Sequence, residues 1–381
     1  MTNLSDLPLR DDLVGQLPYG APQAVVPVAL NVNENTHGIP EDVAHDIVAR
    51  VAAAVLSVNR YPDREFTELR ESFARYLGHG LDASNIWAAN GSNEVLQHIL
   101  QAFGGPGRSL LGFTPTYSMY PLLAAGTGTE WIGVPRAADY TITPDAAAAA
   151  MREHQPDIVF LCSPNNPTGT PLALDVIEAV YAASQYENGA AIVVVDEAYA
   201  EFSPEGTPSA LTLLPGRPRL LVSRTMSKAF AFAGARVGYL AADAAVTDAL
   251  RLVRLPYHLS AFTQAAANAA LAHSEEMLGM VGEIREQRDR LLRELSALGY
   301  APYESASNFV LFGGVEDPRA VFEALLARGI LIREVSLPGQ LRVTAGTETE
   351  TTAFLEALAA VGPNGLGPKV EQSGVARSAT Q

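Results

Sequence analysis

The stretch SRTMSKAFAFAGARVGY, residues 223 to 239, combines an amine, small hydroxyl side chains and a guanidinium. Lys228 follows a short apolar run, with Thr225 and Ser227 just before it and Arg236 beyond it. A lysine in such a position can form a Schiff base with a carbonyl cofactor. The hydroxyls and the guanidinium, which can bind a phosphate as a fork, would then hold that cofactor's phosphate. Taken alone, Lys228 is more typical of a surface lysine in the first turn of a helix.

A second candidate group is Asp196, which directly follows the apolar run IVVV. Burying a carboxylate there is costly unless a cation or a hydrogen-bond donor meets it. A structural salt bridge satisfies this requirement, and so does the protonated ring nitrogen of a cofactor. An acyl-enzyme site of the S-x-x-K type is excluded for Lys228, because residue 225 is threonine and no S-D-N or K-T-G element follows.

The segment ANGSNEVLQHILQAF predicts a strand, a tight turn and a helix, with Ser92 and Asn93 at the turn. The N–H groups at the start of a helix suit a phosphate. Simple capping of the helix by either side chain explains the pattern equally well. The segment SPNNPTG, which contains Asn166, is on its own typical of a turn.

The elements that must position these groups lie between about residues 85 and 240, where short apolar runs alternate with longer amphipathic stretches. This pattern is typical of a parallel sheet covered on both faces. The expected strands are NIWAAN, SLLGFTP, DIVFLCS, AIVVVD and RLLVSRT. Ligands of such sheets bind outside the carboxyl ends of the strands. We therefore expect the polar segments at those ends to converge on one site: GSNE, TPTYSMY, SPNNPTG, DEAY and TMSK.

The later part of the chain predicts a smaller α+β unit, built from NFVLFGG, a helix near residues 317 to 328, GILIREV and QLRVTAG. Four parts are expected. They are an N-terminal arm that wraps over the body (1–45), a large α/β domain with a mostly parallel sheet covered by helices (46–264), a small C-terminal domain completed by part of the arm (265–362), and a disordered tail (363–381).

Composition narrows the possible functions. Lys and Arg total 26 against 42 Asp and Glu, a formal net charge of −16 at pH 7. Such a surface repels nucleic acid and anionic lipid, so an anionic substrate requires a local cluster of positive charge. The single cysteine, Cys162, excludes an intramolecular disulfide and a cysteine-rich zinc site, and the seven histidines show no metal-ligand spacing. Neither a membrane span nor a signal peptide is expected, which favours the cytosol.

Taken together, these motifs resemble the fold-type-I pyridoxal-phosphate aminotransferases, and more closely the actinobacterial type of histidinol-phosphate aminotransferase. The resemblance extends from about residue 15 to 360. It rests on the order and spacing of IWAANGSNE, QAFGGPGRS, SPNNPTG, VDEAY, TMSKAFAFAG and VRLPYHLS. It implies pyridoxal 5'-phosphate as cofactor and a cytoplasmic homodimer with shared active sites.

The resemblance also implies roles around the cofactor. Lys228 would bind it covalently and shuttle protons, and Asp196 would pair with the pyridinium nitrogen. Tyr199 and Asn166 would bind the phenolic oxygen, and Tyr117 would stack on the ring. The phosphate would be held by Ser92, Asn93, Thr225, Ser227 and Arg236. Asn93 departs from the family pattern, in which many relatives have aspartate, but a backbone N–H at that position could still serve.

Substrate-binding residues are implied in the same way. Arg342 in QLRVTAG matches the arginine that receives the substrate anion, and Arg333 in GILIREV matches a second, phosphate-binding arginine. Tyr61 corresponds to a tyrosine contributed across the dimer interface, and Tyr19 to one on the N-terminal arm. Asn166 would contact the substrate as well as the cofactor.

The implied activity is amino transfer between L-histidinol phosphate and 2-oxoglutarate, giving imidazole-acetol phosphate and L-glutamate in histidine biosynthesis. An aromatic amino acid (phenylalanine) aminotransferase is the alternative on the same scaffold, because the same arginine can accept a carboxylate. A decarboxylase of phosphorylated amino acids shares most of the motifs. A binding module without turnover is disfavoured, because Lys228, Asp196 and Arg236 are all present.

Overall fold

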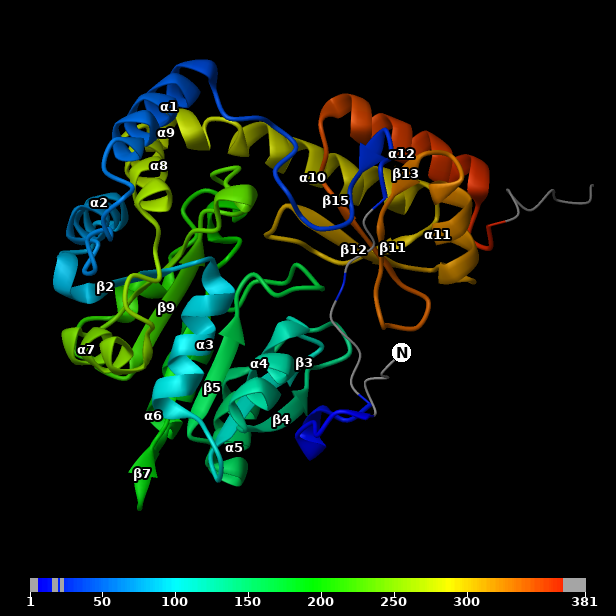
Figure 1. Ribbon diagram of the computed structural model, residues 1–381. Coiled ribbons are helices and arrows are strands. Elements are labelled where there is room, and N and C mark those ends of the chain that lie inside the picture. Colours follow the sequence, from blue (N-terminus) through cyan, green and yellow to red (C-terminus); the bar gives the residue numbers. More distant parts are fainter. Residues whose placement is uncertain (1–5, 16–19, 21–23, 366–381) are drawn as a thin grey trace, which may run out of the picture.

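A seven-stranded sheet forms the centre of the larger part of the molecule in the computed structural model, which describes residues 6–15, 20 and 24–365 (Figure 1). Its strand order is β2-β10-β9-β8-β5-β3-β4; β10 pairs antiparallel with both neighbours, whereas the other pairs are parallel. This confirms the mostly parallel α/β architecture. The strands are β2 (Ile86–Ala89), β3 (Ser109–Thr114), β4 (Glu130–Pro135), β5 (Ile158–Cys162), β8 (Ile192–Asp196), β9 (Leu220–Thr225) and β10 (Gly238–Ala241).

Each apolar run that was expected to be a strand is one. Their continuous apolar character follows from burial on both faces, since every residue of β2 and β5 is buried. The sequence analysis missed β4 and β10. β4 lies at the edge of the sheet, and its residues are exposed or only partly buried, so it lacks a continuous apolar run. β10 has four residues and is too short to be distinguished by pattern.

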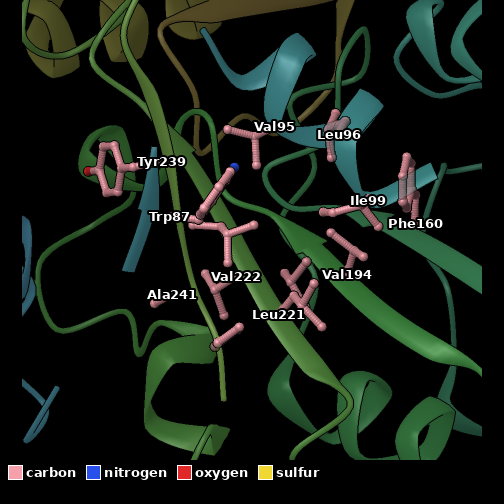
Figure 2. Close-up of a cluster of buried hydrophobic side chains, with 14 of the residues drawn as sticks. Trp87, Val95, Leu96, Ile99, Phe160, Val194, Leu221, Val222, Tyr239 and Ala241 are labelled. Atoms are coloured by element: carbon pink, nitrogen blue, oxygen red, sulfur yellow. The ribbon is translucent and has the colours of Figure 1, made fainter. Parts of the chain in front are cut away.

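Helices pack against this sheet, with α3 contacting β2, β9 and β10, α4 contacting β4, and α6 contacting β8. In α3 the buried residues Val95, Leu96 and Ile99 recur at helical spacing, and Figure 2 shows them in one cluster with Trp87 and Leu221 of the strands. The helices of this part are α1 (Glu41–Val55), α2 (Thr67–Leu77), α3 (Ser92–Phe103), α4 (Met119–Thr127), α5 (Pro144–His154), α6 (Leu174–Ala183), α7 (Ala244–Val253) and α8 (Ala261–Ala272).

A smaller four-stranded sheet, with order β11-β12-β15-β14, has its own buried core. Helices α10, α11 and α12 lie beside it, together with the N-terminal segment drawn in blue (Figure 1). β1 (Val28–Ala29) of that segment pairs in parallel with β13 (Ile330–Leu331). The other elements of this part are α9 (Ser274–Leu278), α10 (Val281–Ala297), β11 (Ala301–Pro302), β12 (Phe309–Gly313), α11 (Pro318–Leu326), β14 (Arg333–Glu334), β15 (Leu341–Thr344) and α12 (Glu348–Val361).

The division of the chain into domains stays a prediction. The expected boundary between residues 264 and 265 falls inside helix α8, which packs against α1 and α2. At the start of the expected tail, the backbone oxygen of Pro363 accepts a hydrogen bond of 2.8 Å from the N–H of Glu316. Residues 366–381 lie outside the described residues.

Short elements connect the larger ones. They are the 3-10 helices η2 (Asp11–Leu13), η3 (Ala83–Asn85), η4 (Ala200–Phe202), η5 (Ala210–Leu213) and η6 (Ala233–Ala235), and the strand pair β6 (Gln185–Tyr186) and β7 (Gly189–Ala190). Within residues 6–15, 20 and 24–365, none of the helices combines the length and the apolar character needed to cross a membrane. The same residues contain no group of three or more His, Cys, Asp or Glu side chains that could hold a metal ion.

Candidate active site

A cavity of about 520 Å³ lies at the carboxyl ends of β5, β8 and β9 and is also lined by residues of the small sheet and of the N-terminal arm. Cavities of this size accommodate small molecules and cofactors. All the polar segments that were expected to converge contribute to its lining. Of the residues singled out from the sequence, it brings together Ser92, Asn93, Tyr117, Asn166, Asp196, Tyr199, Thr225, Ser227, Lys228, Arg236, Arg333 and Arg342.

One end of the cavity is formed by the first turn of α3, which begins at Ser92. The preceding Gly91 has a φ of 87°, a conformation that favours glycine, and a Cβ there would lie 2.2 Å from Nη2 of Arg236. A Cβ on Gly238 would lie 2.1 Å from the backbone nitrogen of Ser92. The two glycines therefore allow a guanidinium and a strand to approach the helix start closely. A helix N-terminus beside an arginine is suited to a phosphate.

Hydroxyl side chains line the same end of the cavity. The Thr225 hydroxyl donates to Ser227 Oγ over 3.0 Å and to the backbone oxygen of Val237 over 3.1 Å. Arg236 donates from Nη1 to Ser227 Oγ over 3.3 Å. The structure thus holds Thr225, Ser227 and Arg236 in one hydrogen-bonded group next to the start of α3.

Asp196 ends β8 with its carboxylate buried, and the side chain is 3% exposed. Its Oδ2 accepts a hydrogen bond of 2.8 Å from the Tyr120 hydroxyl, whereas Oδ1 has no hydrogen-bond partner among the described residues. Burial raises the pKa of Asp196 to about 6, and the Tyr120 hydroxyl and the Ala198 backbone N–H oppose this rise. A cationic donor in the cavity would satisfy Oδ1 and stabilise the charged form.

Lys228 reaches the cavity from the turn after β9. Its Nζ donates to the backbone oxygen of Val32 over 3.0 Å, which links the lysine to the N-terminal arm. Burial lowers the pKa of Lys228 to about 8, and the positive charge of Arg342 adds to this effect. A lowered pKa increases the fraction of neutral amine, which is the nucleophilic form.

The Tyr199 hydroxyl accepts hydrogen bonds from two asparagines, Asn33 Nδ2 over 3.0 Å and Asn166 Nδ2 over 3.2 Å. The side-chain oxygen of Asn166 in turn accepts a hydrogen bond from Arg342. These contacts connect the carboxyl ends of β5 and β8 to the small sheet. Burial raises the pKa of Tyr199 above its ordinary value, so its hydroxyl stays neutral.

Two guanidinium groups from the small sheet face the cavity. Arg342 on β15 lies directly opposite Arg333 on β14 in the antiparallel register, so their side chains share one face of the sheet. Arg342 is buried and stacks over Phe309 at 5.0 Å from the ring centroid. Together with Arg236 these residues supply the local positive charge that an acidic chain needs to bind an anion.

Two of the expected site residues are not placed at the cavity. Tyr61 lies beyond α1, is 79% exposed and stacks on Tyr257 with 4.4 Å between the ring centroids. Tyr19 lies outside the described residues.

The sequence analysis missed Tyr120 and Asn33. Tyr120 belongs to TPTYSMY and lies in the first turn of α4, three positions after Tyr117, which precedes the helix. Asn33 belongs to the Asn-rich arm and has a φ of 56°, a conformation that asparagine tolerates better than most residues. Both residues belong to segments that the sequence analysis singled out, but the sequence of neither segment shows that Tyr120 or Asn33 faces the site.

Comparison with known proteins identifies the family. Residues 26–358 match the model of the family described as aminotransferase class I and II. The histidinol-phosphate aminotransferase of Paenarthrobacter aurescens (strain TC1) is 65% identical over 361 residues, which cover 95% of this chain and 96% of that relative. The chain belongs to the histidinol-phosphate aminotransferase family. A second histidinol-phosphate aminotransferase, from Thermobifida fusca (strain YX), is 58% identical over 93% of this chain and 96% of its own.

Solved structures share the fold of this chain. The crystal structure of histidinol-phosphate aminotransferase from Sinorhizobium meliloti, in complex with pyridoxal-5'-phosphate, superposes with a TM-score of 0.78 at 27% identity and covers 87% of this chain and 90% of that chain. The enzyme of Clostridium acetobutylicum has the same fold, with a TM-score of 0.77 at 22% identity over 87% of this chain and 98% of that chain. The fold-type-I architecture implied by the motifs is confirmed.

Proposed function

We infer that this chain is a pyridoxal-phosphate-dependent transaminase of histidine biosynthesis. It moves an amino group between L-histidinol phosphate and 2-oxoglutarate and forms imidazole-acetol phosphate and L-glutamate. The observation that carries this conclusion is that Lys228, Asp196 and Arg342 line one cavity. The chain that holds them is 65% identical, over 95% of its length, to a histidinol-phosphate aminotransferase.

The residues present fit pyridoxal 5'-phosphate. Asp196 Oδ1 is buried without a partner among the described residues, as an acceptor for a protonated ring nitrogen would be. Gly91 and Gly238 allow the close approach that builds a phosphate site. When bound, the cofactor supplies a carbonyl carbon that condenses with amines and a ring that delocalises the electron pair left by a lost proton.

We assign the residues around the cofactor as follows. Asp196 would keep the ring nitrogen protonated, Tyr199 and Asn166 would hold the phenolic oxygen, and Tyr117 would cover one face of the ring. Support comes from their common cavity and from the hydrogen bond between Asn166 and Tyr199. The phosphate would be bound by Ser92, Asn93, Thr225, Ser227 and Arg236, which line the same cavity. The contribution of Asn93 includes its backbone N–H in the first turn of α3.

Lys228 acts as both the covalent anchor and the proton carrier. Its Nζ is the amine that would hold the cofactor covalently, and once the amine of the substrate has replaced it, the free Nζ would accept the proton released at the α-carbon of the substrate and return it. A pKa lowered to about 8 suits a group that both accepts and donates a proton near neutral pH. The oxo product leaves before the amino acceptor enters the same cavity, so the kinetics are ping-pong.

Arg342 and Arg333 accept the anionic groups of the substrates. Histidinol phosphate has a phosphate and no α-carboxylate, whereas glutamate has carboxylates and no phosphate. A planar guanidinium can bind either anion as a fork, so one arginine can serve both half-reactions. The partner's Tyr61, the arm residue Tyr19 and Asn166 complete the substrate site.

We propose that the enzyme is a homodimer with shared active sites, and we place it in the cytoplasm. Large apolar side chains are exposed at the end of α1 and between α7 and α8, and the stacking of Tyr61 on Tyr257 joins the two segments. Contiguous exposed apolar surface is typical of an interface. The exposed residues are Val55, Leu56, Val58, Tyr61, Leu252, Leu255, Tyr257 and Phe262.

The proposed function is tested by product formation with competing donors. The purified holoenzyme is incubated with 2-oxoglutarate and either L-histidinol phosphate or L-phenylalanine, and L-glutamate is quantified. Histidinol phosphate is expected to have the higher kcat/KM. A preference for phenylalanine would support the aromatic aminotransferase, and release of carbon dioxide without an oxo acid would indicate a decarboxylase.

A further inference from the structure

Tyr120 connects the carboxylate of the site to the aromatic packing behind it. Its side chain has no exposed surface and lies near the start of α4. Its ring makes edge contacts with Tyr117, at 5.5 Å between centroids, and with Phe160, at 5.1 Å. Its hydroxyl donates the 2.8 Å hydrogen bond to Oδ2 of Asp196. The position of this hydroxyl is therefore set by one ring from the segment before α4 and one from β5.

We propose that Tyr120 is a positioning residue that acts through Asp196: its hydroxyl holds Oδ2 and thereby presents Oδ1 to the protonated ring nitrogen of the cofactor. The inference rests on the proposed function, in which Asp196 binds that nitrogen. It adds a residue that touches neither the substrate nor the reacting atoms.

The Asp196 carboxylate is held at one of its two oxygens. The terminal torsion of an aspartate is broad, so a carboxylate without partners samples many orientations. Oδ2 is bound to Tyr120, and Oδ1 has no hydrogen-bond partner among the described residues although Asp196 lines the cavity. One oxygen is thus held by the protein, and the other is left available to a donor that binds in the cavity.

The pKa of Asp196 affects where a proton shared with the ring nitrogen would reside. Burial raises the pKa of Asp196 to about 6, which makes the carboxylate a stronger competitor for the proton of the ring nitrogen. The Tyr120 hydroxyl is the largest influence that opposes this rise, the Ala198 N–H acts in the same direction, and Glu197 acts against both. A hydrogen bond to the charged form favours that form. Tyr120 therefore favours the state in which the proton resides on the ring nitrogen.

The surroundings keep Tyr120 a neutral donor. Burial and the charge of Asp196 raise the pKa of the Tyr120 phenol well above its ordinary value. Cys162, which lies opposite Asp196 in the β5–β8 register, is also buried, and burial raises the pKa of its thiol to about 12. Neither neighbour gains a negative charge near neutral pH that would compete with the carboxylate.

The first measurement is the protonation of the cofactor ring. Holoenzyme is prepared with pyridoxal phosphate labelled with nitrogen-15 in the ring, and the ring nitrogen chemical shift is recorded for the wild type and for Tyr120→Phe. Phenylalanine keeps the ring contacts and removes only the hydroxyl. The shift of Tyr120→Phe is expected to move toward the unprotonated value. A shift identical to that of the wild type overturns the proposal.

The second measurement is a double-mutant cycle on cofactor affinity, obtained by titrating the apoenzymes. A hydrogen bond to a charged group typically changes an equilibrium constant by a factor of about 10 to 100. Tyr120→Phe is expected to weaken cofactor binding by about that factor when Asp196 is present and by less than about threefold in the Asp196→Asn background. Equal weakening in both backgrounds would show that the Tyr120 hydroxyl does not act through Asp196, and would overturn the proposal.

Two control variants distinguish a failure of the role proposed for Tyr120 from a failure of the role proposed for Asp196. Tyr300→Phe removes a buried hydroxyl that has no partner among the described residues. It is expected to change neither the ring nitrogen chemical shift nor the cofactor affinity. Asp196→Asn alone must move the ring nitrogen shift. If it does not, the assigned role of Asp196 fails, and the inference fails with it. If it does while Tyr120→Phe matches the wild type, only the role of Tyr120 fails.

A second variant keeps the test decisive if Tyr120→Phe does not fold. Incorporation of 3-fluorotyrosine at position 120 preserves the shape of the ring and makes the phenol a stronger donor. The nitrogen shift is then expected to move toward the protonated value, opposite to the effect of phenylalanine. An unchanged or opposite shift overturns the proposal.

Discussion

Arg342, on β15 of the small sheet, donates a hydrogen bond from Nη1 to the side-chain oxygen of Asn166, which follows β5 of the large sheet. Its Nη2 donates to the backbone oxygen of Asn31 over 2.8 Å. The guanidinium is therefore held at the cavity by contacts to the large sheet and to the arm. Because ordering a long side chain on binding costs free energy, a guanidinium that is already held in place binds an anion more favourably.

We expect Arg342→Ala to lower kcat/KM by about two to three powers of ten with L-histidinol phosphate and with L-glutamate, because both anions lose the same buried partner. Steady-state kinetics of both directions measure the effect. Arg328→Ala, which removes an exposed arginine of the same small unit, is the matched control and should change neither value.

Arg333 provides the internal comparison for this prediction. Unphosphorylated histidinol is expected to be a poor donor for the wild type and to be little affected by Arg333→Ala, whereas histidinol phosphate should lose activity with that variant. If Arg342→Ala impaired only the reaction with L-glutamate, Arg342 would not bind the anionic groups of both substrates.

The amine of Lys228 is expected to become reactive at a lower pH than an ordinary lysine. Burial lowers the pKa of Lys228 from 10.5 to about 8, so its neutral form predominates above about pH 8. In the apoenzyme, acetylation of Lys228 should therefore rise with pH to a midpoint near 8, measured by mass spectrometry after brief exposure to acetic anhydride. Arg342→Ala should move the midpoint to higher pH, because that positive charge contributes to the lowering.

The composition of the chain makes the covalent assignment simple to check. Lys228 and Lys369 are its two lysines, and Lys369 lies outside the described residues and serves as the reference amine. Borohydride reduction of the holoenzyme, followed by peptide mapping, should find the cofactor on Lys228. Cofactor attached to Lys369 would end the assignment.

Much of the site could be predicted from the sequence because its residues follow buried strands. Asp196 ends β8, and Thr225 ends β9 just before Lys228, so the order of apolar runs and polar segments was sufficient to bring them together. Two strands were not predicted. The edge strand β4 is not buried on both faces and therefore has no continuous apolar run. The strand β10 has only four residues, too few to be recognised from the sequence.

Hydrogen bonds between segments that are far apart in the sequence could not be predicted from the order of apolar and polar runs. The hydrogen bond from Asn33 to Tyr199 joins residues 166 positions apart, and that from Tyr120 to Asp196 joins residues 76 positions apart. Both depend on how the arm and α4 pack on the sheet. Periodicity describes which face of an element is buried, but not which side chain of another element meets it.

Gly238 offers a test of the phosphate site that removes no functional group. Its Cβ would lie 2.1 Å from the backbone nitrogen of Ser92, so Gly238→Ala must push β10 and the start of α3 apart. Overpacking of this kind typically costs about 1–3 kcal/mol. We expect weaker cofactor binding, by roughly tenfold or more, and a lower melting temperature.

Gly234→Ala is the matched control, because a Cβ at that position meets no atom within 4 Å. It should bind the cofactor like the wild type. Unchanged cofactor affinity of Gly238→Ala in the same titration would show that the close approach of β10 to α3 does not shape the phosphate site.

Shared active sites are tested by complementation. Tyr61 does not line the cavity of its own chain and is exposed on the proposed interface, so the dimer would bring it to the partner's site. Lys228→Ala and Tyr61→Ala are each expected to be inactive or nearly so as homodimers. Hybrid dimers should regain activity, because one of their two sites then has both residues intact. Absence of recovery, with subunit exchange verified by mass spectrometry, would place each site within one chain.

The central claim, that this cavity takes its amino group from L-histidinol phosphate, is tested most directly by a single half-reaction. Holoenzyme is mixed rapidly with L-histidinol phosphate or L-phenylalanine in the absence of any oxo acid, and the visible absorbance of the bound cofactor is followed. We expect the band to disappear with L-histidinol phosphate at a rate that saturates at low concentration, and much less efficiently with L-phenylalanine. Faster and tighter conversion by L-phenylalanine would contradict the account.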